Sequence, residues 1–332
     1  MLDSLRSSDE QKTIAAVIPL FGSLEPASLA KRCSQLSTSS QNVWHFVFVF
    51  DGPDSVNVDR LAMAMKEVCI SFDIYELHKN CGVSTAIREG LAACEADVFT
   101  FFGSDGQDPI ELVIQLCDLV LAGDSEVAMG VRETRDDPWV HRIGAALFWR
   151  LQKKYVFQEV PSGGCDVVSL NRGVRDLLLE WQDSDPNIVS QIFALGFPIQ
   201  YTNYERSRRE VGKSSWTLKR KLLYFIDNFF NYGRLPVGIS AFLFLLFSTA
   251  ALTSSITVIL TQNYLTAKGM VIIVGATLLV GVVINLLFAL ILIVYAQKIY
   301  AVSRDIPRVA ARRLNEQKNP SPSGPSSHIS RK

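Results

Sequence analysis

The sequence lacks an excess of charge of either sign. Its 33 basic side chains are balanced by 33 acidic ones, so the formal net charge at pH 7 is zero. Proteins that bind nucleic acid concentrate positive charge, and this composition argues against such a partner. The first residues, MLDSLRSSDEQK, lack the apolar core of a signal peptide. We expect residues 1–12 to form a polar N-terminal tail.

Cysteine pairs and glycine-rich phosphate loops are also missing. The six cysteines show no CxxC spacing, which excludes a zinc site of that type and favours reduced thiols. No GxGxxG follows the first apolar segment, which argues against a nicotinamide dehydrogenase. Gly212-Lys-Ser resembles the end of a P-loop, but Ser207 stands where the earlier glycine is needed.

Charge is absent from two long stretches near the C-terminus, residues 235–260 and 270–296. Each exceeds the roughly 20 residues that a helix needs to cross a membrane. Lysines and arginines flank the pair on both sides, whereas the connecting loop carries only Lys268. This asymmetry predicts a two-helix transmembrane hairpin with both termini and residues 13–214 in the cytoplasm. The tail, residues 297–332, should be basic and partly disordered.

Polar residues near and within the apolar stretches predict two further features. Residues 215–234 combine lysine and arginine with leucine and phenylalanine, which is typical of an amphipathic juxtamembrane helix in the interface. Asn285 is the strongly polar residue of the second stretch, and such residues usually face another helix. We therefore expect a helix contact at Asn285 and a homo-oligomer, for example a tetramer.

The first 130 residues alternate short apolar segments with helical patterns. This alternation predicts an α/β fold with a doubly wound, mostly parallel sheet. In such folds, ligands bind at the carboxyl ends of the strands. The expected strands are Thr13–Pro19, Val43–Phe50, Phe72–Leu77, Val98–Phe102 and Glu126–Val131.

The segment after Val98–Phe102 changes abruptly to small and acidic residues. In an extended chain, residues two apart point the same way, so Gly103, Asp105 and Gln107 should share one side. A carboxylate and an amide oxygen suit Mg²⁺ or Mn²⁺, which predicts Asp105 and Gln107 as metal ligands. A polar turn whose aspartate caps the next helix is the alternative.

Asp51 ends the second expected strand and should lie at the same sheet edge as Asp105. There it could accept hydrogen bonds from a base or ribose. Its alternative role is that of a residue in an Asp-Gly turn.

Six segments resemble the motifs of one known family, in order and at its spacing. They are Val17–Phe21, Phe50–Asp54, Asn80–Ala86 with Gly90, Gly103–Glu111, Gly164–Arg172 and Arg206–Trp216. Together with the apolar stretches, they resemble family-two, GT-A-type glycosyltransferases, specifically the membrane-anchored polyisoprenyl-phosphate group. That group includes dolichol-phosphate mannose synthase and the bactoprenol glucosyltransferases.

The resemblance implies inverting transfer of a sugar from a nucleotide-diphosphate sugar, with a UDP-sugar favoured. The implied acceptor is a polyprenyl phosphate at the cytosolic face, a bacterial inner membrane being favoured, and the implied cofactor is Mg²⁺ or Mn²⁺. A non-lipid acceptor is one alternative. A catalytically silent scaffold is another, because Gly103 and Phe50 stand where the family has aspartates.

The resemblance also implies roles for individual residues. Nucleotide-sugar binding falls to Pro19, Leu20, Phe21, Asp51, Gly82, Ser104 and Asp105. Acceptor-phosphate binding falls to Arg132, Arg135, Arg142, Arg206, Arg209, Lys213 and Ser214. Asp105, Asp166 and Arg132 are the implied catalytic residues, although Asp166 could instead cap the loop before Val167.

Overall fold

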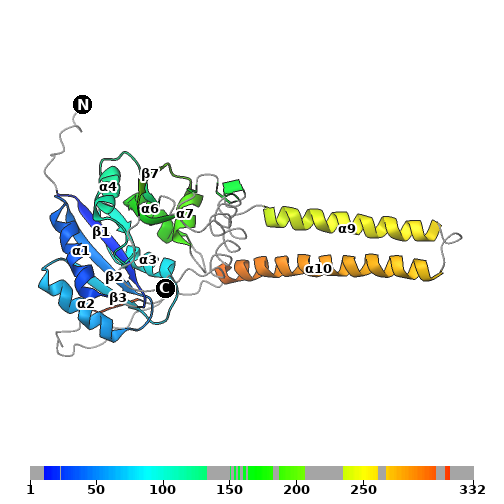
Figure 1. Ribbon diagram of the computed structural model, residues 1–332, viewed down its shortest axis with the longest axis horizontal. Helices are drawn as coiled ribbons and strands as arrows, with labels where there is room; N and C mark the ends of the chain where they lie inside the picture. The colour runs from blue at the N-terminus through cyan, green and yellow to red at the C-terminus, as the bar shows by residue number, and fades with distance from the viewer. Residues whose placement is uncertain are drawn as a thin grey trace, which may run out of the picture.

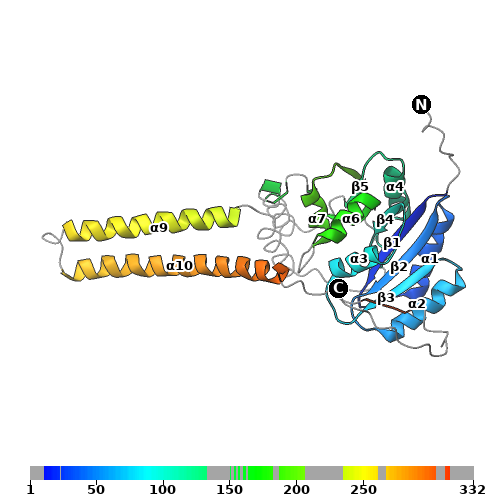
Figure 2. The same ribbon diagram turned by 180° about the vertical axis from the view of Figure 1, so that it is seen from behind.

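The computed structural model contains an α/β domain and two long helices that extend away from it (Figures 1 and 2). The residues that it describes are 11–22, 24–132, 150, 153–154, 156–157, 160–161, 164–181, 187–205, 235–260, 267–303 and 311–314. Within these ranges the predicted α/β class is confirmed.

The described strands form one sheet in the order β7-β5-β6-β4-β1-β2-β3-β8. Their bounds are β1 Thr13–Leu20, β2 Val43–Phe50, β3 Phe72–Leu77, β4 Val98–Phe101, β5 Val127–Arg132, β6 Cys165–Asn171, β7 Ile199–Tyr204 and β8 Ala311–Arg313. β6 and β8 run antiparallel to their neighbours, and the other pairs are parallel. The sheet is therefore mostly parallel, as predicted.

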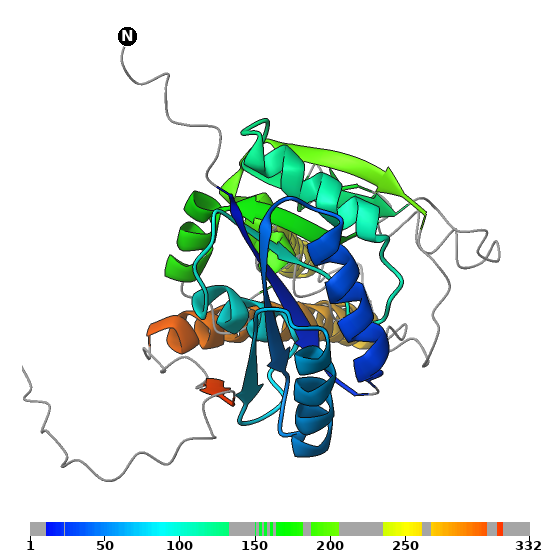
Figure 3. The same cartoon turned by 90° about the vertical axis from the view of Figure 1, so that its left-hand side faces the viewer.

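Helices cover both faces of the sheet (Figure 3). Their bounds are α1 Pro26–Thr38, α2 Ser55–Glu67, α3 Val83–Ala92, α4 Ile110–Leu121, α6 Arg172–Glu180 and α7 Ile188–Leu195. One apolar cluster joins α1, α2 and α4 to the sheet, and a second joins α3, α6 and α7 to its other face. The central strands are buried on both sides, which explains why they are almost uninterrupted apolar runs.

Gly90 lets α3 approach the sheet closely. A Cβ atom at this position would lie 2.4 Å from Cγ1 of Val17 in β1 and 3.1 Å from Cγ2 of Val49 in β2. Any larger residue would push α3 away from the strands. The start of α3, at the carboxyl edge of the sheet, is thereby held near β1 and β2.

The long helices α9, Leu235–Leu260, and α10, Ala267–Ser303, lie side by side. The Phe244 and Phe288 rings stack between them, with centroids 5.3 Å apart. In the described chain, one helix is long and apolar enough to cross a membrane, over Val274–Gln297, whereas the apolar part of α9, Ala241–Thr257, is shorter. The predicted hairpin of two spans, residues 235–260 and 270–296, is therefore not confirmed.

Asn285 bonds within its own helix. Its Nδ2 atom donates a hydrogen bond to the carbonyl oxygen of Gly281, 2.8 Å away on α10. The expected helix contact of Asn285, between protomers, stays a prediction.

Strand β8 joins part of the C-terminal tail to the sheet. It comes from the tail expected to be partly disordered, and it pairs with the edge strand β3 of the domain predicted to end at residue 214. The backbone N–H of Leu314 continues the pairing by donating to Ile74, 2.9 Å away. This short strand is stabilised by a partner about 240 residues away in the chain. Its local sequence therefore gives no sign of a strand.

Arg313 attaches this strand to the sheet. Its Nη2 and Nε atoms donate to Oδ1 of Asp73, at 2.7 and 3.2 Å. Nε2 of His45 lies 3.2 Å from Oδ2 of the same carboxylate. Asp73 is buried, so its carboxylate depends on these partners.

We expect Arg313→Ala to lower the free energy of unfolding of the α/β domain by about 1 kcal/mol, since Arg313 is partly exposed and its ion pair is screened. Thermal unfolding of the full chain in detergent measures this as a melting temperature lower by about 2–4 °C. The matched control is Arg312→Ala, because Arg312 is the exposed neighbour on the same strand. An equal loss in both variants would contradict a specific role for Arg313.

Candidate functional site

The carboxyl ends of the parallel strands bring several predicted site residues to one edge of the sheet. Leu20 is paired with Phe50, at the ends of β1 and β2. β6 runs antiparallel to β4, and Phe101 at the end of β4 lies opposite Val168 of β6. Asp166, at the start of β6, therefore lies beside the segment that follows β4. This edge is where open α/β sheets bind ligands.

Asp51 fixes the turn that follows β3. It is 7% exposed, and its two carboxylate oxygens accept hydrogen bonds from the backbone N–H groups of Cys81, at 2.6 Å, and Gly82, at 2.9 Å. Gly82 has a φ of +93° and precedes the first residue of α3. Asp51 therefore joins β2 to the start of α3, a structural role that its position in an Asp-Gly sequence did not reveal.

A hollow of about 260 Å³ lies beside Asp51. Phe21, at its rim, is 70% exposed, which is unusual for a large aromatic side chain. The structure brings Leu20, Phe21, Asp51 and Ser104 of the predicted nucleotide site together here, whereas Pro19 and Gly82 lie in the adjoining backbone. The lining residues are Leu20, Phe21, Gly22, Leu24, Phe50, Asp51, Gly52, Pro53, Asp54, Asn80 and Ser104.

Residues 104–106 form a turn, so the expected extended geometry from Gly103 to Gln107 is wrong. Gly106 has a φ of +70°, and Oδ1 of Asp105 accepts a hydrogen bond from the backbone N–H of Gln107, 3.3 Å away. Asp105 is half-buried and Gln107 is 5% exposed. The turn chemistry of aspartate and glycine thus overrides the alternation of a strand.

Asp108, next to this turn, has two partners that were not predicted, Tyr204 and Arg32. Asp108 is 1% exposed, and its Oδ1 accepts a hydrogen bond from the hydroxyl of Tyr204, 2.9 Å away at the end of β7. Arg32 of α1 donates to the carbonyl oxygen of Asp108, at 2.7 Å. Asp108 stands within the recognised motif, but nothing in the sequence links it to Tyr204, because the contact depends on strand order.

The oxygen donors at this edge fit a hard divalent cation whose remaining coordination positions are filled by phosphate or water. Among the described residues, no group of three histidine, cysteine or acidic side chains could hold a metal by itself. A Cβ atom at Gly103 would lie 3.3 Å from Oδ1 of Asp105 and 3.6 Å from Oδ2 of Asp108, so both carboxylates lie close to this glycine. Carboxylate and amide oxygens are suitable Mg²⁺ ligands, and Mg²⁺ commonly completes its shell with phosphate and water.

Arg132 and Asp166, both predicted to be catalytic, form an ion pair at the same edge. Arg132 ends β5 and Asp166 is the second residue of β6, and each side chain is about one third exposed. The neighbouring Cys165 is no nucleophile, because burial raises the pKa of its thiol to about 12. All six cysteines are free, as predicted.

The remaining predicted residues lie outside the described part of the chain. They are the acceptor-phosphate candidates Arg135, Arg142, Arg206, Arg209, Lys213 and Ser214, together with the predicted juxtamembrane helix over residues 215–234. Their roles stay predictions.

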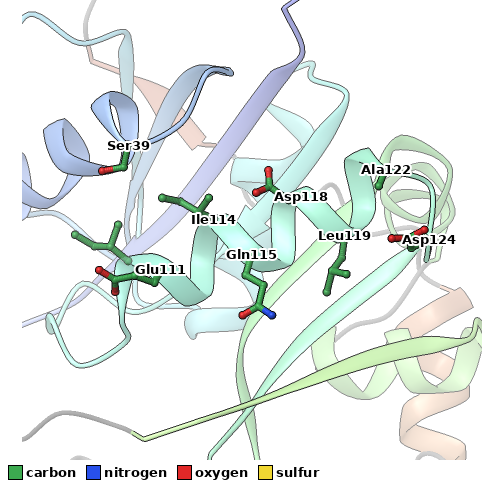
Figure 4. Close-up of a pocket in the computed structure, with 9 residues that line it drawn as sticks. Ser39, Glu111, Ile114, Gln115, Asp118, Leu119, Ala122 and Asp124 are labelled. Carbon is green, nitrogen blue, oxygen red and sulfur yellow. The ribbon is translucent and has the colours of Figure 1, made fainter. Parts of the chain in front are cut away.

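A second hollow, of about 590 Å³, lies on α4 and contains none of the predicted site residues. Figure 4 shows Glu111, Gln115 and Asp118 projecting from α4 around it. Burial raises the pKa of the Asp118 carboxyl. Asp124, which also lines this hollow, comes just before β5, at the amino edge of the sheet. This hollow therefore shares no lining residue with the hollow beside Asp51.

Comparison with known proteins yields a family match and two related proteins. A family model described as Glycosyl transferase family 2 matches residues 16–181, half of the 332-residue chain. The uncharacterized glycosyltransferase YkcC of Bacillus subtilis (strain 168) is 24% identical over 222 residues, which cover 66% of this chain and 67% of that protein. The uncharacterized glycosyltransferase sll0501 of Synechocystis sp. is 20% identical over 232 residues, 69% of this chain and 72% of that protein.

Among solved structures, a match is glucosyl-3-phosphoglycerate synthase from Mycobacterium tuberculosis in complex with phosphoglyceric acid. It has 16% sequence identity and a TM-score of 0.42, covering 60% of this chain and 73% of that chain. The same enzyme with Mn²⁺, UDP-glucose and glycerol 3-phosphate gives 16% identity and a TM-score of 0.40 over the same shares.

We expect Asp51→Ala to lower the free energy of unfolding by about 2–3 kcal/mol, because it removes the acceptor of two backbone N–H groups. Hydrogen exchange should accelerate at the amides of Cys81 and Gly82, and a chemical unfolding curve gives the loss of stability. Asp59→Ala, at an exposed position of α2, is the control and should change neither quantity. Unchanged exchange in Asp51→Ala would contradict the role assigned to this carboxylate.

Proposed function

The chain belongs to glycosyl transferase family 2, and on that basis we propose that it transfers a sugar from a nucleotide-diphosphate sugar to a polyprenyl phosphate, with inversion. A UDP-sugar is the favoured donor, and the reaction would take place at the cytosolic face of a membrane. The observation that carries the proposal is a single sheet edge that combines a hollow, an acidic turn and an arginine–aspartate pair.

The hollow beside Asp51 suits the nucleotide. Phe21 offers an exposed aromatic face on which a base could stack, and stacking would cover this side chain. Asp51 would contribute indirectly, because its carboxylate holds the Cys81–Gly82 turn next to the hollow. Ser104 in the lining precedes Asp105, so the donor's diphosphate would extend from the hollow toward the acidic turn.

Asp105 and Gln107 would hold Mg²⁺ or Mn²⁺ at this turn. When bound, the ion would act as a Lewis acid that stabilises the charge developing on the departing diphosphate. The hydrogen bond from the Gln107 N–H to Asp105 fixes the carboxylate in the turn, so little reorganisation is needed as the donor binds.

Arg132 would position the acceptor phosphate against the donor. A phosphate monoester is already an anion near neutral pH, so it needs cationic positioning more than a general base. Asp166 pairs with Arg132 and holds the guanidinium at the strand edge, and both side chains are exposed enough to meet a ligand. The arginines and Lys213 outside the described residues would add to this positive surface.

The long apolar helix supports a membrane-associated acceptor. Val274–Gln297 meets the length and composition of a span, and large apolar side chains on α9 and α10 are exposed. We propose that α9 and α10 together anchor the enzyme, with both termini and the α/β domain cytoplasmic. A homo-oligomer in the membrane is part of the same proposal.

A second candidate function is that of a catalytically silent scaffold. It is favoured by Gly103 and Phe50, which occupy positions of two family aspartates. Phe50 is 3% exposed and belongs to the apolar cluster on the α1 face, so it contributes packing and no charge.

The first experiment is a transfer assay with the purified full chain in lipid, undecaprenyl phosphate and a panel of radiolabelled UDP- and GDP-sugars, with and without Mn²⁺. We expect metal-dependent label in the organic phase from one UDP-sugar. Nucleotide binding without transfer from any donor would favour either a non-lipid acceptor or the scaffold.

We further expect Asp105→Ala to lower kcat by roughly 100- to 1000-fold, the usual loss when a group that stabilises leaving-group charge is removed. Asp124→Ala is the matched control, because Asp124 is an exposed aspartate in the hollow on α4. Steady-state kinetics with the donor identified above should show normal turnover for the control. Full turnover in Asp105→Ala would exclude this carboxylate from the reaction.

A further inference from the structure

Two carboxylates lie close to Gly103, which has no side chain of its own. Oδ1 of Asp105 and Oδ2 of Asp108 lie 3.3 and 3.6 Å from the point that a Cβ atom at this position would occupy. One oxygen comes from the middle of the turn that follows β4, and the other comes from a residue just beyond this turn. An aspartate at position 103 would add a third carboxylate beside these two, with a shift of Asp105 by a few tenths of an ångström.

Asp108 is held firmly in this arrangement. The Tyr204 hydroxyl donates to its Oδ1, at 2.9 Å, and Arg32 donates to its carbonyl oxygen, at 2.7 Å. The hydrogen bond from Tyr204 to Oδ1 therefore also fixes the position of Oδ2, the oxygen nearer Gly103. Asp108 is 1% exposed, and ionised carboxylates at such depth are stabilised by cations.

Gly130 provides the room that Tyr204 needs. A Cβ atom at position 130 of β5 would lie 3.2 Å from Cε1 of Tyr204 and 2.9 Å from Cδ2 of Leu112. A side chain there would crowd the tyrosine ring, which lies over β5 and carries the hydroxyl to Asp108. Gly130 thus lets the tyrosine ring reach the carboxylate of Asp108.

We propose that Asp108, positioned by Tyr204, is a second carboxylate ligand for a divalent cation, in place of an aspartate at position 103. Asp105 supplies the first carboxylate and Gln107 an amide oxygen. The proposal rests on the proposed function, because the cation is the one that would bind the nucleotide diphosphate. It also explains how Gly103 can be compatible with a metal site.

Binding of Mn²⁺ to the full chain in detergent, with UDP at saturation, tests this without turnover. The electron paramagnetic resonance signal of free Mn²⁺ gives the Kd. Asp108→Asn should raise the Kd by at least 10-fold, because one anionic ligand is lost. Tyr204→Phe keeps the ring packing and removes only the hydroxyl, and it should raise the Kd by roughly 10-fold. Asp124→Asn is the control and should leave the Kd unchanged.

A rescue variant separates ligation from folding. Gly103→Asp in the Asp108→Asn background should return the Kd to within about threefold of the original value, because it restores a second carboxylate beside Asp105. Melting temperatures are measured for each variant. A merely structural role of Tyr204 would lower its melting temperature and leave the Kd unchanged, which would overturn the positioning role.

Two results would overturn the assignment of Asp108. One is an unchanged Kd for Mn²⁺ in Asp108→Asn, measured beside an Asp105→Asn variant that has lost Mn²⁺ binding. In that case the metal site of the proposed function would stand without Asp108. The other is sugar transfer that proceeds fully without divalent cations, with no Mn²⁺ bound in the presence of UDP. In that case the proposed transfer would stand and this inference would fail.

Discussion

The constraint on which the site depends is the parallel alignment of β1 with β2 and β4. Their pairing brings the carboxyl ends of all three strands to one edge, where Leu20, Asp51 and Ser104 meet around the hollow. The apolar side chains of each strand alternate between the two helical layers, so a register slip of one residue would exchange the faces. The chemistry at the edge is therefore fixed by packing that lies well inside the sheet.

The sequence was sufficient to predict the sheet and the edge, because both follow from local patterns. Apolar runs that end in polar residues identify the strands, and parallel topology requires that their ends meet. Asp51 and Asp105 were expected at this edge on that basis, whereas Arg132 and Asp166 were named only through the family resemblance. The shape of the Gly103–Gln107 segment was not predicted, because a turn with a left-handed Gly106 competes with the extended chain and cannot be distinguished by spacing alone.

Contacts between distant strands were not predicted, because they depend on the order of the strands in the sheet. Tyr204 meets Asp108 across β5 only because β7 pairs with β5 and Gly130 leaves room for the ring. Likewise, Arg313 finds Asp73 because β8 returns to the sheet edge. No periodicity records such partners. Asp51 illustrates the intermediate case, since its position at a strand end was correct and its bonds to the Cys81–Gly82 turn required the fold.

The pairing of β8 also restricts where the site can lie relative to α10. Ala311 is opposite Leu77, the carboxyl end of β3, so the chain that leaves α10 enters the sheet at the edge that carries the site. Eight peptide steps separate Ser303 from Ala311, and they span no more than roughly 29 Å. If α10 anchors the chain in a membrane, the strand-end residues are kept near the surface where a lipid phosphate would be found. The pairing of β8 with β3 would then help to orient the carboxyl edge of the sheet toward the membrane surface.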